Sequence, residues 1–262
     1  MPSADAAALA QLVSRATVVD LSVTTGPDLP CAPPEGQRPA QFMMNWYTWP
    51  RGPFLEYVQV HDDHTGTHID SPSHFTPALD TGLAHATEFG SVTIEQVPLE
   101  QMMGPAAVVD VRPLIDEAPP GETTHLAASP VITAQHLVDW EAEHGPFERG
   151  EIVLFHTGWS DRYYRPYPDG FGYDRSHPAP GEDAIAHLYE RGVRHIGIDA
   201  RGIGLMQDDY TPHWAALGRG MVATENLTNL GELPTRGAFF LFLPHKFEAA
   251  SGGLGRAIAF VP

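Results

Sequence analysis

Residues 61–75 read His-Asp-Asp-His-Thr-Gly-Thr-His-Ile-Asp-Ser-Pro-Ser-His-Phe, and no other stretch of the chain says as much about its fold. The stretch holds four of the fourteen histidines of the protein, His61, His64, His68 and His74. β-Branched residues and a glycine follow His64, and both disfavour a helix. We therefore expect extended backbone from His64 to the proline near the end of the stretch.

Alternate side chains of an extended segment lie on one face. His64, His68 and Asp70 are separated by even offsets, so we expect all three to point the same way. Gly66 lies between them and has no side chain to fill the space. Two imidazoles and a carboxylate around an open space form a donor set for Zn²⁺ or Mn²⁺.

Two further histidines of this stretch have different predicted roles. Pro72 is expected to end the strand, which leaves His74 just beyond the metal site as a free imidazole. Such a group can transfer protons near neutral pH, so His74 is the candidate catalytic residue. His61 shares the even face, and we interpret it as a surface residue or as a partner that supports a ligand.

Three ligands leave the coordination shell of a cation incomplete, and the segments after the strand that ends near Asp199 contain further candidates. His213 lies in a Thr-Pro-His-Trp segment, and Glu225 lies in a Thr-Glu-Asn-Leu segment. Their spacing alone does not single out either residue. A glutamate ahead of an asparagine is equally typical of a capping residue.

Residues 64–75 resemble the H-x-G-T-H-x-D-x-P-x-H-F signature of the cyclase family, which includes bacterial kynurenine formamidases and isatin hydrolases. The resemblance extends over most of the chain. The other segments that carry it are residues 19–22, 196–199, 225–230 and 243–256.

This resemblance implies a set of site residues. One metal ion would be bound by His64, His68, Asp70 and Glu225. In members with two metals, the second ion would be held by Asp70, His213 and Glu225, with the carboxylates bridging. His74 would take the family's proton-transfer role. The implied cofactor is one or two divalent ions, Zn²⁺ or Mn²⁺.

The resemblance implies an α/β fold, with a mixed β-sheet and flanking helices of the swivelling β/β/α type. We expect one such domain over residues 1–262, because strands and helices alternate without a linker. The implied activity is metal-dependent hydrolysis of an amide, lactam or related carbon–nitrogen bond in a small aromatic or cyclic substrate. One alternative is a cyclase or dehydratase that acts on a polyketide-like metabolite at the same site. A non-catalytic metal- or ligand-binding protein is another, but a sensor has no need of His74.

Two features depart from the kynurenine formamidases. Those enzymes carry an aromatic residue in a P-x-[WF]-P-G loop, and Ala32 stands at that position here. The chain is also longer, with aromatic-rich loops at 34–53 and 159–178. Both features count against N-formylkynurenine as substrate, and we expect loop aromatics to bind an aromatic or cyclic one.

Composition limits the partners and the location. Lys and Arg number 15 against 33 Asp and Glu, a net charge of −18, which predicts no binding to nucleic acid or to an anionic membrane. The single cysteine, Cys31, excludes an internal disulfide and is expected to be an ordinary thiol. With no secretory signal or membrane span expected, we predict a cytoplasmic homo-oligomer, a dimer or tetramer, that acts on a small molecule.

Local patterns predict the main elements and exclude other active sites. The chain lacks the G-x-G-x-x-G, G-x-S-x-G and H-E-x-x-H motifs of dinucleotide-binding proteins, serine hydrolases and zinc proteases. Long loops are expected at 24–53 and 159–173. Helices are expected at 3–13, 133–145, 180–191 and 213–217, and strands at 17–23, 57–61, 106–111, 151–157, 193–199, 239–243 and 257–261.

Overall fold

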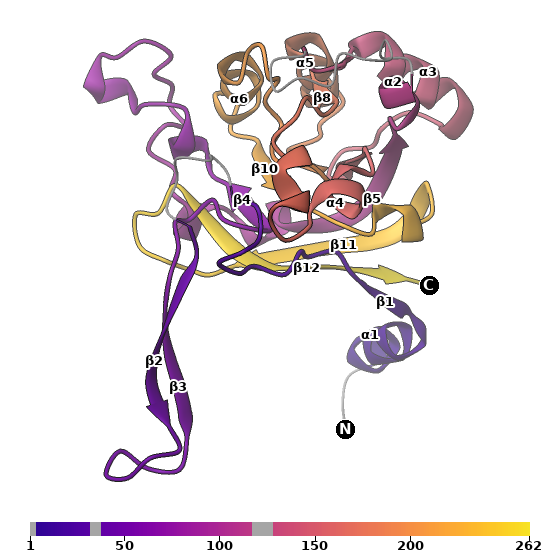
Figure 1. Ribbon diagram of the computed structural model, residues 1–262. Coiled ribbons are helices and arrows are strands. Elements are labelled where there is room, and N and C mark those ends of the chain that lie inside the picture. Colours follow the sequence, from indigo (N-terminus) through magenta and orange to yellow (C-terminus); the bar gives the residue numbers. More distant parts are fainter. Residues whose placement is uncertain (1–3, 32–37, 117–127) are drawn as a thin grey trace.

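The computed structural model describes residues 4–31, 38–116 and 128–262 (Figure 1). Eight strands form the main sheet: β1 Thr17–Asp20, β4 His68–Asp70, β5 Met103–Asp110, β7 Ile152–His156, β9 His195–Ile198, β10 Val222–Glu225, β11 Arg236–Pro244 and β12 Gly252–Val261. Their order is β1-β12-β11-β5-β7-β9-β10-β4, and β4 also pairs with β12, so the sheet closes on itself. The expected fold class, a mixed sheet with flanking helices, is confirmed, because β5, β7, β9 and β10 run parallel while the other pairs are antiparallel.

Most of the helices cover one face of this sheet, above its parallel strands in Figure 1, whereas the N-terminal helix lies below the sheet, beside the first strand. The α-helices are α1 Ala4–Arg15, α2 Pro113–Asp116, α3 Ala134–His144, α4 Trp159–Tyr163, α5 Glu182–Glu190 and α6 Tyr210–Leu217. Short 3₁₀ turns are η1 Pro72–His74, η2 Leu79–Thr81, η3 Ile94–Gln96, η4 Leu99–Gln101, η5 Asp169–Gly172 and η6 Leu230–Glu232. A capping box between Thr133 and His136 starts α3, as the position of Thr133 predicts.

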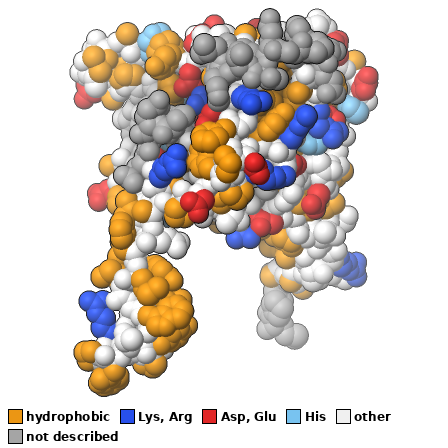
Figure 2. Space-filling view, viewed as in Figure 1, with side chains coloured by type: hydrophobic (Ala, Val, Ile, Leu, Met, Phe, Trp, Pro, Cys, Tyr) orange, Lys and Arg blue, Asp and Glu red, His pale blue; other side chains and the backbone are white. Residues whose placement is uncertain are grey.

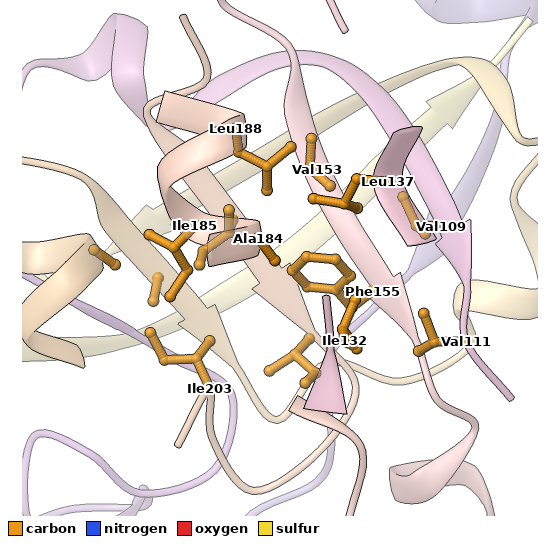
Figure 3. Close-up of a cluster of buried hydrophobic side chains, with 14 of the residues drawn as sticks. Val109, Val111, Ile132, Leu137, Val153, Phe155, Ala184, Ile185, Leu188 and Ile203 are labelled. Atoms are coloured by element: carbon orange, nitrogen blue, oxygen red, sulfur yellow. The ribbon is translucent and has the colours of Figure 1, made fainter. Parts of the chain in front are cut away.

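The core has two parts, one on each face of the parallel strands. Along β7, Val153 and Phe155 face α3 and α5, whereas Ile152 and Leu154 point into the closed sheet. Figure 3 shows the helix-side cluster, where Leu137 of α3 and residues of α5 pack over Phe155. A strand covered on both faces is a continuous apolar run, which is why residues 151–157 are readable as a strand.

An arm made of β2 Ala40–Trp46 and β3 Leu55–Val60 projects away from the body (Figure 1). The two strands pair only with each other. The prediction of a loop throughout 24–53 is therefore wrong for residues 40–46. The proline and glycine residues that suggest a loop lie on either side of this strand, before residue 40 and in the turn at Pro50, Gly52 and Pro53, whereas residues 40–46 contain neither type.

Other predicted boundaries shift by a few residues. Strand β1 stops at Asp20 rather than continuing to residue 23, because Ser22 makes only an isolated bridge to Leu227. The predicted loop at 159–173 contains α4 and η5, and β10 was not predicted. A further two-stranded sheet pairs β6 Val131–Ile132 with β8 Ala179–Pro180. Within the described ranges, we find no helix of the length and apolar character that crossing a membrane requires.

Candidate metal centre

The backbone of the histidine-rich stretch differs from the predicted strand. Residues 64–67 form a turn, and only residues 68–70 are extended as β4. Gly66 has φ +65°, and a Cβ atom there would lie 2.2 Å from Oγ1 of Thr25. Gly66 is thus needed for a left-handed turn and a close approach, and not to leave room among ligands. His64, His68 and Asp70 converge nevertheless, because the turn brings His64 back beside the strand.

Three segments bring the candidate ligands together. Strand β4 lies beside β10 and places His68 directly opposite Glu225. Nε2 of His68 lies 3.4 Å from Oδ1 of Asp70 and 3.4 Å from Oε2 of Glu225. Helix α6 supplies His213, whose Nε2 lies 3.4 Å from Oε1 of Glu225 and 3.8 Å from Oδ2 of Asp70. The structure therefore gathers four of the predicted ligands within one buried cluster.

Backbone carbonyls fix the orientation of two imidazoles in this cluster. Nδ1 of His68 donates a hydrogen bond to the carbonyl of Gly66 at 2.8 Å, and Nδ1 of His213 donates to the carbonyl of Asp209 at 2.5 Å. In a neutral ring this leaves Nε2 with a free lone pair directed at the carboxylates. Such a backbone contact is the usual support of a metal-binding histidine.

The spacing of the donor atoms fits a cation between them. Tetrahedral ligands at about 2.1 Å from zinc lie roughly 3.4 Å from each other, which matches the distances of His68 and His213 to Glu225. Oδ2 of Asp70 is buried and has no hydrogen-bond partner in the described part of the chain. A bound divalent ion would satisfy this oxygen, so the residues present fit the metal that the sequence predicts.

Electrostatics within the cluster favour the charged carboxylates. Burial opposes protonation of His68, but hydrogen bonds and charge from Asp70 and Glu225 outweigh it and raise its pKa to about 10. The same balance, with Glu225 as the main partner, raises the pKa of His213 to about 9. Burial and the charge of Asp70 oppose ionisation of Glu225, yet contacts with His213 and His68 lower its pKa to about 2. The site therefore needs positive charge, whether it comes from protons or from a cation.

His64 and His74 form the other side of the site. Nδ1 of His64 lies 2.8 Å from Oδ1 of Asp70, and its Nε2 lies 2.9 Å from the hydroxyl of Ser251. The His74 ring stacks on His64 at a centroid distance of 3.7 Å, and its Nε2 lies 4.0 Å from Oδ2 of Asp70. Donor atoms of His64, Asp70 and His74 thus form a second group that shares Asp70 with the first. Burial lowers the pKa of His74 to about 4, so at neutral pH its imidazole is neutral.

Some residues that shape this site were not found from the sequence. Oδ2 of Asp63 accepts hydrogen bonds from the backbone and hydroxyl of Ser251 and from the backbone of Gly252. Ser251 in turn contacts His64, so the residue that precedes β12 positions a histidine 187 residues away in the chain. The Phe75 ring stacks on His213 at 4.0 Å. Among these residues, only Phe75 was marked in the sequence, because it is the last residue of the family signature.

A cavity of about 260 Å³ opens onto the cluster. Its lining residues are Asp62, His64, His68, His74, Phe75, Arg201, Gly202, Asp209, His213 and Glu225. Among the lining residues, Phe75 has an aromatic hydrocarbon ring and Arg201 has a guanidinium group.

The predicted aromatic loops do not line this cavity in the described part of the chain. Tyr164 and Tyr173 are buried in the helix-side core, and the hydroxyl of Tyr173 donates to the side chain of Asn226. Tyr173 therefore supports the residue next to Glu225 instead of facing the cavity. His61 is exposed, in agreement with a surface residue, and Cys31 is buried, which raises the pKa of its thiol. Ala32 lies outside the described residues.

Comparisons with known proteins show which family the chain belongs to. The family described as "Putative cyclase" matches residues 19–204. The chain is 29% identical to the isatin hydrolase of Roseibium aggregatum over 221 residues, which cover 80% of this chain and 77% of that protein. It is 27% identical to the kynurenine formamidase of Salinibacter ruber over 197 residues, 74% of each chain. The crystal structure of an isatin hydrolase bound to the product analogue thioisatinate matches with a TM-score of 0.83, 25% identity and full coverage of both chains.

The closed mixed sheet, the buried cluster of histidines and carboxylates that could hold a metal ion, and the similarity to isatin hydrolases and kynurenine formamidases together indicate a hydrolase of the metal-dependent class. The chain belongs to the cyclase family, as its signature predicts. The predicted enzyme class is also confirmed, a hydrolase of carbon–nitrogen bonds other than peptide bonds.

Proposed function

We propose that the protein uses one or two divalent ions, Zn²⁺ or Mn²⁺, to open the ring of a small cyclic amide related to isatin. The observation that carries the proposal is the buried cluster in which Nε2 atoms of His68 and His213 face Asp70 and Glu225. The similarity to isatin hydrolases supports the substrate class. The proposed ligands are His64, His68, Asp70, His213 and Glu225.

The chain's own residues have distinct proposed tasks in this reaction. When bound, the divalent ion polarises the substrate carbonyl and acidifies a water molecule. His74 is neutral and lies at the cavity wall, so its Nε2 can accept a proton from the attacking water. It then delivers that proton to the nitrogen as the carbon–nitrogen bond breaks, which leaves a carboxylate and an amine. Arg201 lines the same cavity and is placed to attract that carboxylate.

Phe75 supplies the proposed contact for the substrate ring. Its own ring is partly exposed at the cavity and is held by stacking on His213. An offset aromatic stack contributes about 1 kcal/mol beyond the area that it buries. This contact replaces the loop aromatics that the sequence suggested as the substrate wall.

A substrate panel tests this function. Protein reconstituted with Zn²⁺ or Mn²⁺ is incubated with isatins, other lactams, lactones and N-formylkynurenine, and products are analysed by mass spectrometry. We expect isatin-type lactams to gain one water, and N-formylkynurenine to react roughly 10–100-fold more slowly, because Ala32 stands where formamidases carry an aromatic residue.

Two results would contradict the proposal. N-formylkynurenine as the best substrate would make the protein a formamidase. Products that gain no water, formed from a linear polyketide-like substrate, would favour the cyclase or dehydratase alternative. The proposal also includes a cytoplasmic location and a homo-oligomer of two or four chains, which cell fractionation and light scattering test.

A further inference from the structure

A second cavity, of about 380 Å³, lies at the same edge of the main sheet as the metal cluster. Its lining includes Asp110, where β5 ends, Thr157, which follows β7, and Trp159, Arg162 and Tyr163 of α4. Strands β5 and β7 are parallel neighbours, and the carboxyl ends of parallel strands are the usual place for ligands in such sheets. Among the described residues, none lines both this β5–β7 cavity and the cavity at the metal cluster.

The polar groups at the floor of the β5–β7 cavity are already paired. The backbone N–H groups of Thr157 and Gly158 donate to the carboxylate of Asp199 at 2.6 and 2.8 Å. The N–H group of Trp159 donates to the hydroxyl of Thr157 at 3.0 Å, and this hydroxyl donates to Asp199 at 2.7 Å. A ligand therefore has to be recognised by the other side chains of the lining.

Two guanidinium groups supply the donors for such recognition. Arg112 donates from Nε and Nη2 to the carboxylate of Asp110 at 2.9 and 2.6 Å, which leaves three of its five N–H donors available. Arg162 forms no ion pair with a carboxylate of the described residues. Its guanidinium lies over the ring of Tyr163, 5.1 Å from the centroid, a contact that orients the group without using its N–H donors.

The lining has more positive than negative charge, although the whole chain carries a net charge of −18. Asp110 is the one carboxylate among the lining residues, against two guanidinium groups, and Arg112 already binds it. The cavity at the metal cluster has the opposite balance, with three carboxylates and one guanidinium group. Figure 2 shows several Lys and Arg side chains beside hydrophobic ones on the part of the body where Figure 1 places α4. The β5–β7 cavity therefore favours an anion.

The other walls of the cavity are apolar and held in place. Pro113 and Ile115 line one side, and the rings of Trp159 and Tyr163 line another. The indole N–H of Trp159 donates to the carbonyl of Tyr173 at 2.9 Å, and the ring centroid of Trp159 lies 4.5 Å from that of Tyr163. Aromatic walls fixed in this way can receive a flat ring without being ordered first.

The combination of donors and apolar walls selects the class of ligand. An inorganic anion would use the guanidinium groups but leave the apolar walls uncovered. An uncharged aromatic compound would cover the walls but leave the donors of Arg162 without an acceptor. A planar carboxylate matches the fork of a guanidinium group, and the volume of the cavity is within the range of small-molecule sites.

We propose that the β5–β7 cavity is a second ligand site, separate from the metal cluster, which binds a small aromatic carboxylate. Arg162 and Arg112 bind the carboxylate, and the ring lies against Trp159 and Tyr163.

Isothermal titration of the full-length, metal-loaded protein with sodium benzoate tests the role of Arg162. The variant Arg162→Ala should bind benzoate about 10–100-fold more weakly than the wild type, the loss expected for a hydrogen bond to a charged group. Arg162→Lys keeps the charge but lacks the planar fork, so its affinity should be intermediate. The control Arg51→Ala changes the net charge equally on the distant arm and should bind as the wild type does. Unchanged affinity in Arg162→Ala would overturn the proposal.

Two analogues of benzoate test the class of ligand on the same protein. Benzamide keeps the ring but has no charge, and acetate keeps the carboxylate but has no ring. Each should bind at least about 10-fold more weakly than benzoate. Equal affinity for benzamide would show that the cavity does not recognise an anion, and equal affinity for acetate would show that the ring makes no contact. A wild type that binds no benzoate at about 10 mM would also overturn the proposal.

Photolabelling with 4-azidobenzoate tests the position of the ligand. Mass spectrometry of the digested protein should find the label in residues 112–115 or 157–163, and excess benzoate should prevent this labelling. In Arg162→Ala the labelling of these segments should fall with the affinity. Label found only in residues 62–75 or 201–213 would place benzoate at the metal cluster and contradict a second site. These outcomes do not depend on the substrate that the enzyme prefers.

Discussion

Strand β3 ends at Val60, and the cluster of candidate metal ligands begins only four residues later at His64. Before that point large apolar side chains are exposed, for example Phe42 at 56%, and after it polar side chains are buried, with Asp70 at 0%. Both regions depart from the rule that apolar groups are inside and polar groups outside. The comparison teaches that the two regions depart from this rule in opposite directions: the cluster buries charges that a cation would compensate, and the arm exposes apolar area that water solvates poorly.

The two regions differ in the free-energy cost of their unusual distribution of side chains. Burial of an ionised carboxylate costs several kcal/mol unless an opposite charge compensates it, and the cluster buries both Asp70 and Glu225. The exposed side chains of the arm forgo favourable burial but break no hydrogen bonds. The cluster therefore should respond far more strongly to single substitutions than the arm, and the following predictions test that difference.

The largest effect is expected from Asp70→Ala. Asp70 faces His64, His68, His74 and His213, so its removal takes a carboxylate from both groups of candidate ligands. Bound metal should be lost and turnover should fall by more than about 10⁴-fold. Elemental analysis and steady-state kinetics measure both losses. The matched control Asp110→Ala removes an exposed carboxylate paired with an arginine and should keep metal and activity. Metal retained in Asp70→Ala would contradict the assignment.

His74→Ala should separate proton transfer from metal binding. The variant is expected to fold and to retain metal, but to lose turnover by about 10²–10⁴-fold, the usual contribution of a positioned acid–base group. The comparison of metal occupancy with activity is decisive, since His74 lies beside His64 and Asp70. If occupancy falls with activity, His74 is a ligand. If both are unchanged, the proton follows another route.

A pair of phenylalanines compares the core with the arm directly. Phe240 is fully buried inside the closed sheet, whereas Phe42 on β2 is 56% exposed. Phe240→Ala should lower the free energy of unfolding by about 3–5 kcal/mol because it leaves a cavity. Phe42→Ala should change it by less than about 0.5 kcal/mol, because more than half of this side chain is already exposed to water. Denaturant titrations check both values, and a large loss for Phe42→Ala would show that the arm is part of the core.

His195 tests whether the neighbouring carboxylates cause the raised pKa values of His68 and His213. It is as buried as His68, but its neighbours are the carbonyl of Gln101 and the hydroxyl of Thr224. Burial therefore lowers the pKa of His195 to about 4. The unfolded chain binds this proton near pH 6.5, so stability should fall between pH 6.5 and about 4, by at most about 3 kcal/mol.

The variant His195→Gln should show a shallower loss of stability over the same pH range. Glutamine keeps hydrogen-bonding groups at this position but binds no proton. The exposed control His144→Gln should leave the pH dependence as in the wild type. An unchanged slope in His195→Gln would show that His195 is not the group whose protonation opposes folding.

The sequence predicted most of the site and much of the fold for identifiable reasons. Elements with a local sequence pattern were predicted correctly. Strand β7 is an almost continuous apolar run, and Thr133 is the capping residue at the start of α3. The convergence of His64, His68 and Asp70 was predicted, although through an extended strand rather than the turn at Gly66. His213 and Glu225 required the family resemblance, because their approach to Asp70 depends on the packing of α6 and β10.

The remaining features depend on contacts that a sequence pattern does not carry. Ser251 reaches His64 only because β12 closes the sheet against β4. The arm was hidden because its turn is rich in proline and glycine, which resembles a loop. Aromatic residues of the loop at 159–178 were expected to bind the substrate, but packing places Tyr173 of this loop in the core.

Metal analysis tests the central claim that the buried cluster holds a divalent ion. Protein purified without chelator is dialysed, and its metal content per chain is measured for the wild type, for His68→Ala and for the exposed control His61→Ala. The account predicts about one or two ions of zinc or manganese in the wild type and in His61→Ala, and almost none in His68→Ala. A wild type without stoichiometric metal that takes up neither ion on titration, or a His68→Ala protein that keeps the wild-type content, would contradict it.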